Sequence, residues 1–123
     1  MNVALWIAAS VLALAFAAAG LMKLTRPKEA LAGSQPWTED FSAGTIKLIG
    51  ALEVLGAIGL ILPGITGIAP ILVPLAATGL AIIMVLAAIT HIRRHEASNV
   101  IANVVLLALA VFVAWGRFGP YAF

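Results

Sequence analysis

The chain has 123 residues, of which 63% are hydrophobic and only 10% are charged, whereas average soluble domains carry about 25% charged residues. A water-soluble domain this apolar could not cover its surface, so the composition predicts a single domain that lies in lipid. The seven Lys and Arg residues are dispersed near the ends of apolar segments and form no basic face, which excludes a nucleic-acid partner despite the formal charge of +2.

Cysteine is absent, which excludes disulfides, thiol redox chemistry and thiolate metal sites. The two His residues have no convergent carboxylate motif beside them, so no metal site is predicted. The sequence shows no nucleophilic triad and no phosphate-binding loop, and it leaves open whether the protein catalyses a reaction. The N-terminus lacks the positive segment of a signal peptide, so the first apolar run is predicted to be a retained membrane helix.

Four segments are long and apolar enough to cross a hydrocarbon core, which takes roughly 20 residues. The predicted spans are Val3 to about Leu24, about Thr45 to Leu62 (closed by Pro63-Gly64), about Ala69 to Thr90 (with Pro70 and Pro74 near its start) and about Asn99 to Trp115. The fold class predicted from this pattern is all-α: a polytopic membrane protein in which residues 1–123 form one four-transmembrane-helix bundle.

The connections between the spans differ in length and charge. The first, Thr25 to Gly44, is long, and its Pro36-Trp37 pair followed by TEDF predicts a short surface helix with Trp37 and Phe41 in the membrane interface. The first and third connections lie on one side, which holds Lys23, Arg26, Lys28, Lys47, Arg93 and Arg94, whereas the other side holds only Arg117. The positive-inside rule therefore predicts a bacterial inner membrane protein with these two connections in the cytoplasm and both termini outside.

Glu53 is the clearest polar residue within a predicted span. It lies eight residues beyond Thr45, about 12 Å from the cytoplasmic end of the helix at 1.5 Å per residue. A carboxylate at that depth costs roughly 2.5–3.5 kcal/mol on insertion scales, so we expect it to face the bundle. It is predicted to be either a proton or ligand site or an interhelical contact that stabilises packing. Its ionisation is left open.

Two residues are candidate partners of Glu53. Asn103 approaches the same depth from the fourth span, where it is equally an ordinary interhelical hydrogen-bonding residue. Lys23 ends the first span and either pairs with Glu53 through its long stem or extends to the cytoplasm. Gly20, Gly50 and Gly56 are predicted to lie at close helix–helix contacts.

His91 ends the third span, where it is either a proton relay or a solvated interfacial residue. Arg94 and His95, which follow it, are predicted to be solvated loop residues. The candidate ligand or proton-site residues are therefore Glu53, Lys23, His91, Asn103 and, from the resemblance described next, Arg117.

Four segments resemble the successive signature segments of the DoxX-like membrane proteins: AAAGLMKLTRP, LIGALEVLGAIGLILP, AAITHIRRHE and VFVAWGRFGPY. The match covers essentially the whole chain in order. The resemblance implies a four-helix bundle with family-pattern polar positions at Lys23, Glu53, His91 and Arg117. The family takes its name from a subunit of a thiosulfate:quinone oxidoreductase. Relatives are associated with membrane redox complexes, and distant ones assist receptor assembly.

These observations leave three functions open. The first is an accessory or small-ligand-binding subunit of a membrane redox system, for which a quinone is the natural lipid-soluble ligand. The second is a structural or assembly factor that packs against a larger membrane protein complex. The third is a small proton-coupled transporter, which is disfavoured because small multidrug transporters carry their essential carboxylate on the first helix rather than the second. The oligomeric state is left open.

Overall fold

The computed structural model describes every residue of the chain apart from the side chain of Ser34. Five α-helices and one 3₁₀ helix follow one another: α1 (Asn2–Thr25), α2 (Lys28–Ser34), η1 (Pro36–Asp40), α3 (Ala43–Thr66), α4 (Leu72–Arg93) and α5 (Ala97–Phe118). The four long helices are long and apolar enough to cross a membrane. The fold is the four-helix transmembrane bundle that the composition predicts.

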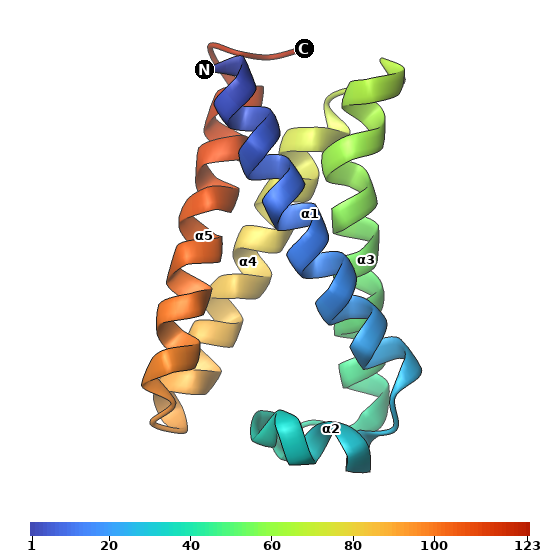
Figure 1. Cartoon of the computed structure of the whole chain (residues 1–123), viewed down its shortest axis with the longest axis vertical. Helices are drawn as coiled ribbons and strands as arrows, with labels where there is room; N and C mark the ends of the chain where they lie inside the picture. The colour runs from blue at the N-terminus through green and yellow to red at the C-terminus, as the bar shows by residue number, and fades with distance from the viewer.

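The bundle consists of two helix pairs that diverge toward one end. α1 packs along α3, and α4 packs along α5. α1 approaches α5 near the end that holds both termini and crosses away from it toward the other end, where α2 lies across the opening between the pairs (Figure 1). The first connection of the chain therefore lies at the end where the two pairs are farthest apart.

Large apolar side chains fill the centre of the bundle and also cover its outside. The buried set comes from all four long helices and includes Leu12, Phe16, Leu60, Leu80 and Val113. Many others, such as Leu14 and Leu55, are more than half exposed. In lipid this exposure costs nothing, because the acyl chains are as apolar as the side chains.

The end of α3 differs from the prediction. We expected Pro63 to close this helix, but α3 continues through Pro63 to Thr66 and ends at Gly67, whose φ of 71° lies in the left-handed region. A glycine adopts this conformation without steric cost and is the usual residue after a helix end. Membrane helices accommodate an internal proline where neighbouring groups compensate for the missing backbone donor.

The third long helix also differs at its start. α4 begins at Leu72 rather than at Ala69, which itself has a positive φ of 48°. Pro74 falls in the first turn of α4, where a backbone N–H has no acceptor within the helix. The proline therefore does not interrupt the helix.

Candidate ligand-binding site

The site is built on a buried ion pair between α1 and α3. Lys23 Nζ lies 2.7 Å from Glu53 Oε1, and the two side chains are 8% and 3% exposed. Lys23 was predicted either to pair with Glu53 or to extend to the cytoplasm, and in the structure it pairs with Glu53.

A close contact between α1 and α3 allows the Lys23 side chain to reach Glu53. A Cβ atom added at Gly50 would lie 2.7 Å from Lys23 Cβ, and one added at Gly20 would lie 2.6 Å from the carbonyl oxygen of Gly50. Both distances are too short for any side chain. The absence of a side chain at each glycine lets α1 and α3 approach, so that the lysine stem crosses α3 at Gly50 and reaches the carboxylate.

An aromatic ring from η1 lies beside the ion pair. Lys23 Nζ is 5.6 Å from the centroid of the Trp37 ring, within the range of a cation–π interaction. The same ring meets that of His91 edge-on, with centroids 6.2 Å apart and an interplanar angle of 81°. Trp37 also contacts Phe41. The tryptophan that we expected in the membrane interface thus lies between a lysine of α1 and a histidine of α4.

Polar contacts order the α4–α5 turn, and one of them joins it to η1. His91 Nδ1 lies 2.7 Å from Glu96 Oε1, and Arg94 lies 3.5 Å from Glu96 Oε2. Arg94 Nη1 also donates to Asp40 Oδ2 at 3.0 Å. The prediction that Arg94 is simply solvated was therefore wrong, because it bridges the first and third connections. His95 is exposed, as expected for a loop residue.

The charge on Glu96 follows from these neighbours. The hydrogen bond from His91 lowers the pKa of Glu96 below its usual range, and Arg94 acts in the same direction. Because an ionised carboxylate only accepts hydrogen bonds, Nδ1 of His91 carries the proton in this contact. Glu96 therefore sets the orientation of the His91 ring that faces Trp37.

Asn103 is buried on α5 with an unused donor. The residue is 9% exposed, and its Nδ2 has no hydrogen-bond partner among the described residues. It does not donate to Glu53, which was one of the predicted partnerships. At 1.5 Å per residue, Asn103 lies about 9 Å from the start of α5, and Glu53 about 15 Å from the start of α3. Both residues therefore lie in the first half of their helices.

Comparison with known proteins now places the chain. The sequence profile of the DoxX-like family matches residues 7–113. The chain belongs to the DoxX-like family. Comparisons with curated proteins and with solved structures find no match.

The matched range of this DoxX-like protein includes Lys23, Glu53, His91 and Asn103 and ends before Arg117. The structure also sets Arg117 apart from the other candidate residues. Lys23 and His91 contact the Trp37 ring and Glu53 pairs with Lys23. Arg117 lies at the opposite end of the bundle, where it donates to Asn2 Oδ1. Four of the five predicted residues therefore lie in the half of the bundle that η1 covers, and the fifth belongs to a different surface.

Sequence reasoning did not select Trp37, Asp40 or Glu96 as site residues. Trp37 was assigned to the interface because an aromatic residue near a membrane end is usually found there. A signal for Asp40 was present, since acidic residues of the first connection and basic residues of the third were predicted on the same side. Gly56, the third predicted packing glycine, lies against Leu80 of α4.

Proposed function

We propose that this DoxX-like protein is a small-ligand-binding accessory subunit of a membrane redox system, and that its ligand is quinone-like: flat, apolar and edged with carbonyl oxygens. The observation that carries the proposal is the place of the Trp37 ring, between the Lys23 ammonium and the His91 ring. A flat aromatic group already fits between two polar side chains there. In the proposal, a quinone ring takes the place of the indole.

The polar groups in this half of the bundle suit such a ligand. Small-molecule sites combine an apolar lining with a few polar groups that set orientation. Lys23 is a donor whose only ionic partner is Glu53, and the Nδ2 donor of Asn103 has no acceptor. A buried donor without an acceptor costs about 1–3 kcal/mol. A ligand carbonyl that accepts from Asn103 or Lys23 would recover part of that cost.

The way in runs through η1. This segment is only five residues long, and its contact with the α4–α5 turn includes the pair Arg94–Asp40, whose side chains are partly exposed. Solvent and salt screen exposed ion pairs, so displacing η1 costs little at this contact. The displacement would open the divergent end of the bundle, beside which α2 and η1 lie (Figure 1).

The accessory role rests on the family. DoxX-like relatives are associated with membrane redox complexes, and the apolar outer faces of the four helices give this protein surface for a larger partner. A structural or assembly role is the main competing function. It predicts a bound protein complex and no quinone.

The first test is a titration of the purified protein with a short-tailed quinone, followed by tryptophan fluorescence. Trp37 should be quenched as the quinone binds, so Trp37→Phe should remove most of the saturable signal. Trp115→Phe, a matched change at the opposite end, should retain it. A hydrocarbon of the same length without carbonyl groups should not compete. Absence of saturable quenching in the wild-type protein would refute the quinone proposal.

The second test uses Glu53→Gln, which keeps the size of the side chain and removes its charge. If Glu53 serves a ligand site, the variant should fold and bind the quinone more weakly, because Lys23 then lacks the anion that holds its position. If Glu53 serves packing alone, quinone binding should not change. Detergent-phase stability and quinone affinity are measured on the same sample, so misfolding is not mistaken for lost binding.

A further inference from the structure

Arg117 forms a separate polar centre at the end of the bundle that holds both termini. It is 5% exposed. Its Nη1 donates to Asn2 Oδ1 at 2.6 Å and to the backbone oxygen of Tyr121 at 2.9 Å. The guanidinium carbon lies 4.0 Å from the centroid of the Phe123 ring and 5.6 Å from that of Trp6. Aromatic rings from both ends of the chain thus form the walls around the cation.

No acidic side chain neutralises this cation. The five acidic residues of the chain are Glu29, Glu39, Asp40, Glu53 and Glu96. Four of them lie in the connections at the opposite end, and the fifth pairs with Lys23. No ion pair joins Arg117 to any group that the structure describes. A charge held away from water is costly unless it is paired, so an anion that paired with Arg117 would stabilise this end of the bundle.

Two of the three guanidinium nitrogens are available to such an anion. Nε and Nη2 have no hydrogen-bond partner among the described residues, yet neither is among the fully enclosed atoms that lack one. Both groups therefore remain free to donate to an added anion. Adjacent N–H groups of a guanidinium match two oxygens of a phosphate in a bidentate contact.

An apolar groove leads away from the same place along α1. It has a volume of about 360 Å³ and is lined by Val3, Trp6, Ile7, Ser10, Val11 and Leu14. Trp6 belongs both to this groove and to the walls around Arg117. From residue 3 to residue 14 the helix rises about 16 Å, close to half of a hydrocarbon core of about 30 Å. The groove thus has the length of one lipid leaflet.

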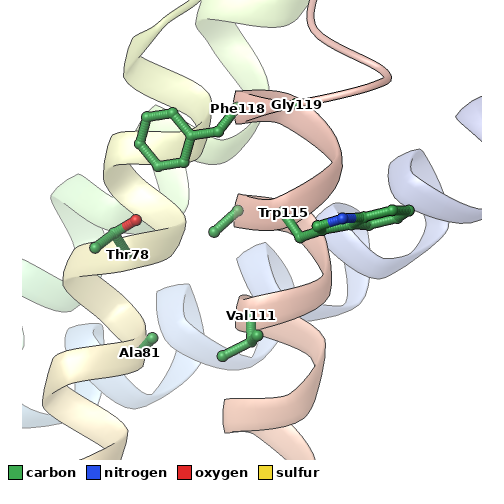
Figure 2. Close-up of a pocket in the computed structure, with 7 residues that line it drawn as sticks. Thr78, Ala81, Val111, Trp115, Phe118 and Gly119 are labelled. Atoms are coloured by element: carbon green, nitrogen blue, oxygen red, sulfur yellow. The ribbon is translucent and has the colours of Figure 1, made fainter.

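A second hollow provides a contrast. It has a volume of about 480 Å³ and lies between α4 and α5, where Thr78 and Ala81 face Val111 and Phe118 (Figure 2). The hydroxyl of Thr78, the polar side chain on its α4 wall, already donates to the backbone oxygen of Pro74. This hollow offers no free cation, so it gives no reason to bind a charged lipid.

We propose that Arg117 binds the phosphate of an anionic phospholipid whose acyl chain lies in the α1 groove. The unneutralised guanidinium selects a ligand with net negative charge. The groove selects one that carries a hydrocarbon chain. The site is independent of the quinone proposal, since it shares no residue with it.

The test is native mass spectrometry of the full-length protein after equilibration in detergent with phosphatidylglycerol, with phosphatidylcholine or with inorganic phosphate. Phosphatidylglycerol should be retained in preference to phosphatidylcholine. Arg117→Gln should reduce its retention about tenfold or more, as expected for loss of charge-assisted hydrogen bonds. Arg93→Gln, a matched loss of an exposed cation at the other end, should leave retention unchanged.

Ser10→Trp provides a second variant in case Arg117→Gln does not fold. Ser10 is exposed and lines the groove, so the indole should block the acyl chain without touching the guanidinium. Retention of phosphatidylglycerol should fall. Equal retention of the two lipids, or unchanged retention in Ser10→Trp, would overturn the proposal. If inorganic phosphate alone displaces the lipid completely at equal concentration, the site takes a free anion and the lipid proposal is wrong.

Discussion

Lys23 of α1 crosses α3 at Gly50, where a Cβ atom would come within 2.7 Å of the lysine Cβ. Three residues further along α3, Glu53 forms an ion pair with the ammonium group of Lys23. Gly20 of α1, three residues before Lys23, lies against the backbone of α3. Helix packing and the buried ion pair are therefore one feature, and a change in the packing should move the ion pair.

Gly50→Ala should lower the thermal stability of the protein in detergent. The added methyl group meets both Lys23 Cβ and the backbone oxygen of Gly20, and overpacking of this kind costs about 1–3 kcal/mol. Gly79→Ala is the matched control, because Gly79 lies in α4 with no atom within 4 Å of the added position. It should be neutral or slightly stabilising. Equal melting temperatures for the wild type and Gly50→Ala would show that α1 and α3 separate easily here.

Lys23→Met should destabilise the protein more than the double variant Lys23→Met/Glu53→Gln. Removal of the lysine leaves a buried carboxylate without its counter-charge, at a cost of about 3–5 kcal/mol. The second substitution removes that charge and should restore most of the loss. Thermal unfolding of both single variants and the double variant completes the cycle. If the two substitutions are simply additive, the 2.7 Å contact has no energetic role.

Asn103→Leu should not lower stability, although the residue is buried. Its Nδ2 has no partner among the described residues, so an apolar side chain of similar volume removes an unsatisfied group. Under the proposed function the same variant should bind the short-tailed quinone about tenfold more weakly. A stability loss of the size seen for a broken interhelical hydrogen bond would instead make Asn103 a packing residue.

The contacts of Glu96 with His91 and Arg94 should weaken in acid. The pKa of Glu96 is lowered in the folded protein, so its contribution to stability is present above its unfolded-state pKa and is lost as the pH falls through the folded value. We expect the melting temperature to fall in acid, at pH values below the usual pKa range of a glutamate, because the folded pKa of Glu96 is lowered. Glu96→Gln should be less stable at neutral pH and should lose this part of the pH dependence. An unchanged pH profile in Glu96→Gln would assign the acid sensitivity to another carboxylate.

The orientation across the membrane is open to direct labelling, since the chain has no native cysteine. We predict that Ala122→Cys reacts with an impermeant thiol reagent in intact cells and that Ser98→Cys reacts only after permeabilisation. Both positions are exposed and lie at opposite ends of the bundle. The prediction rests on the positive charge of the connections around α2 and the α4–α5 turn. The reverse labelling pattern would invert the orientation.

Hydropathy and length alone predicted the four membrane helices, because burial in lipid depends on the composition of each segment and not on its neighbours. They also indicated that Glu53 faces inward, since a carboxylate toward acyl chains has no compensating contact. Helix ends were less accurate. A proline such as Pro63 usually ends or kinks a helix in a soluble protein. In a membrane, neighbouring helices can compensate for the missing backbone donor, and α3 continues to Thr66.

Only the tertiary structure decided which polar groups meet. Arg94 pairs with Asp40 across 54 positions, and Arg117 binds Asn2 across 115. Many such pairings satisfy the same charges, and the choice among them depends on how each helix is rotated and where the first connection returns across the bundle end. Trp37 shows this most clearly. Its aromatic side chain is typical of a membrane interface, but the path of η1 places it beside both Lys23 and His91. Local hydropathy determines what lies in the membrane, whereas contacts between distant segments determine what lies beside Glu53.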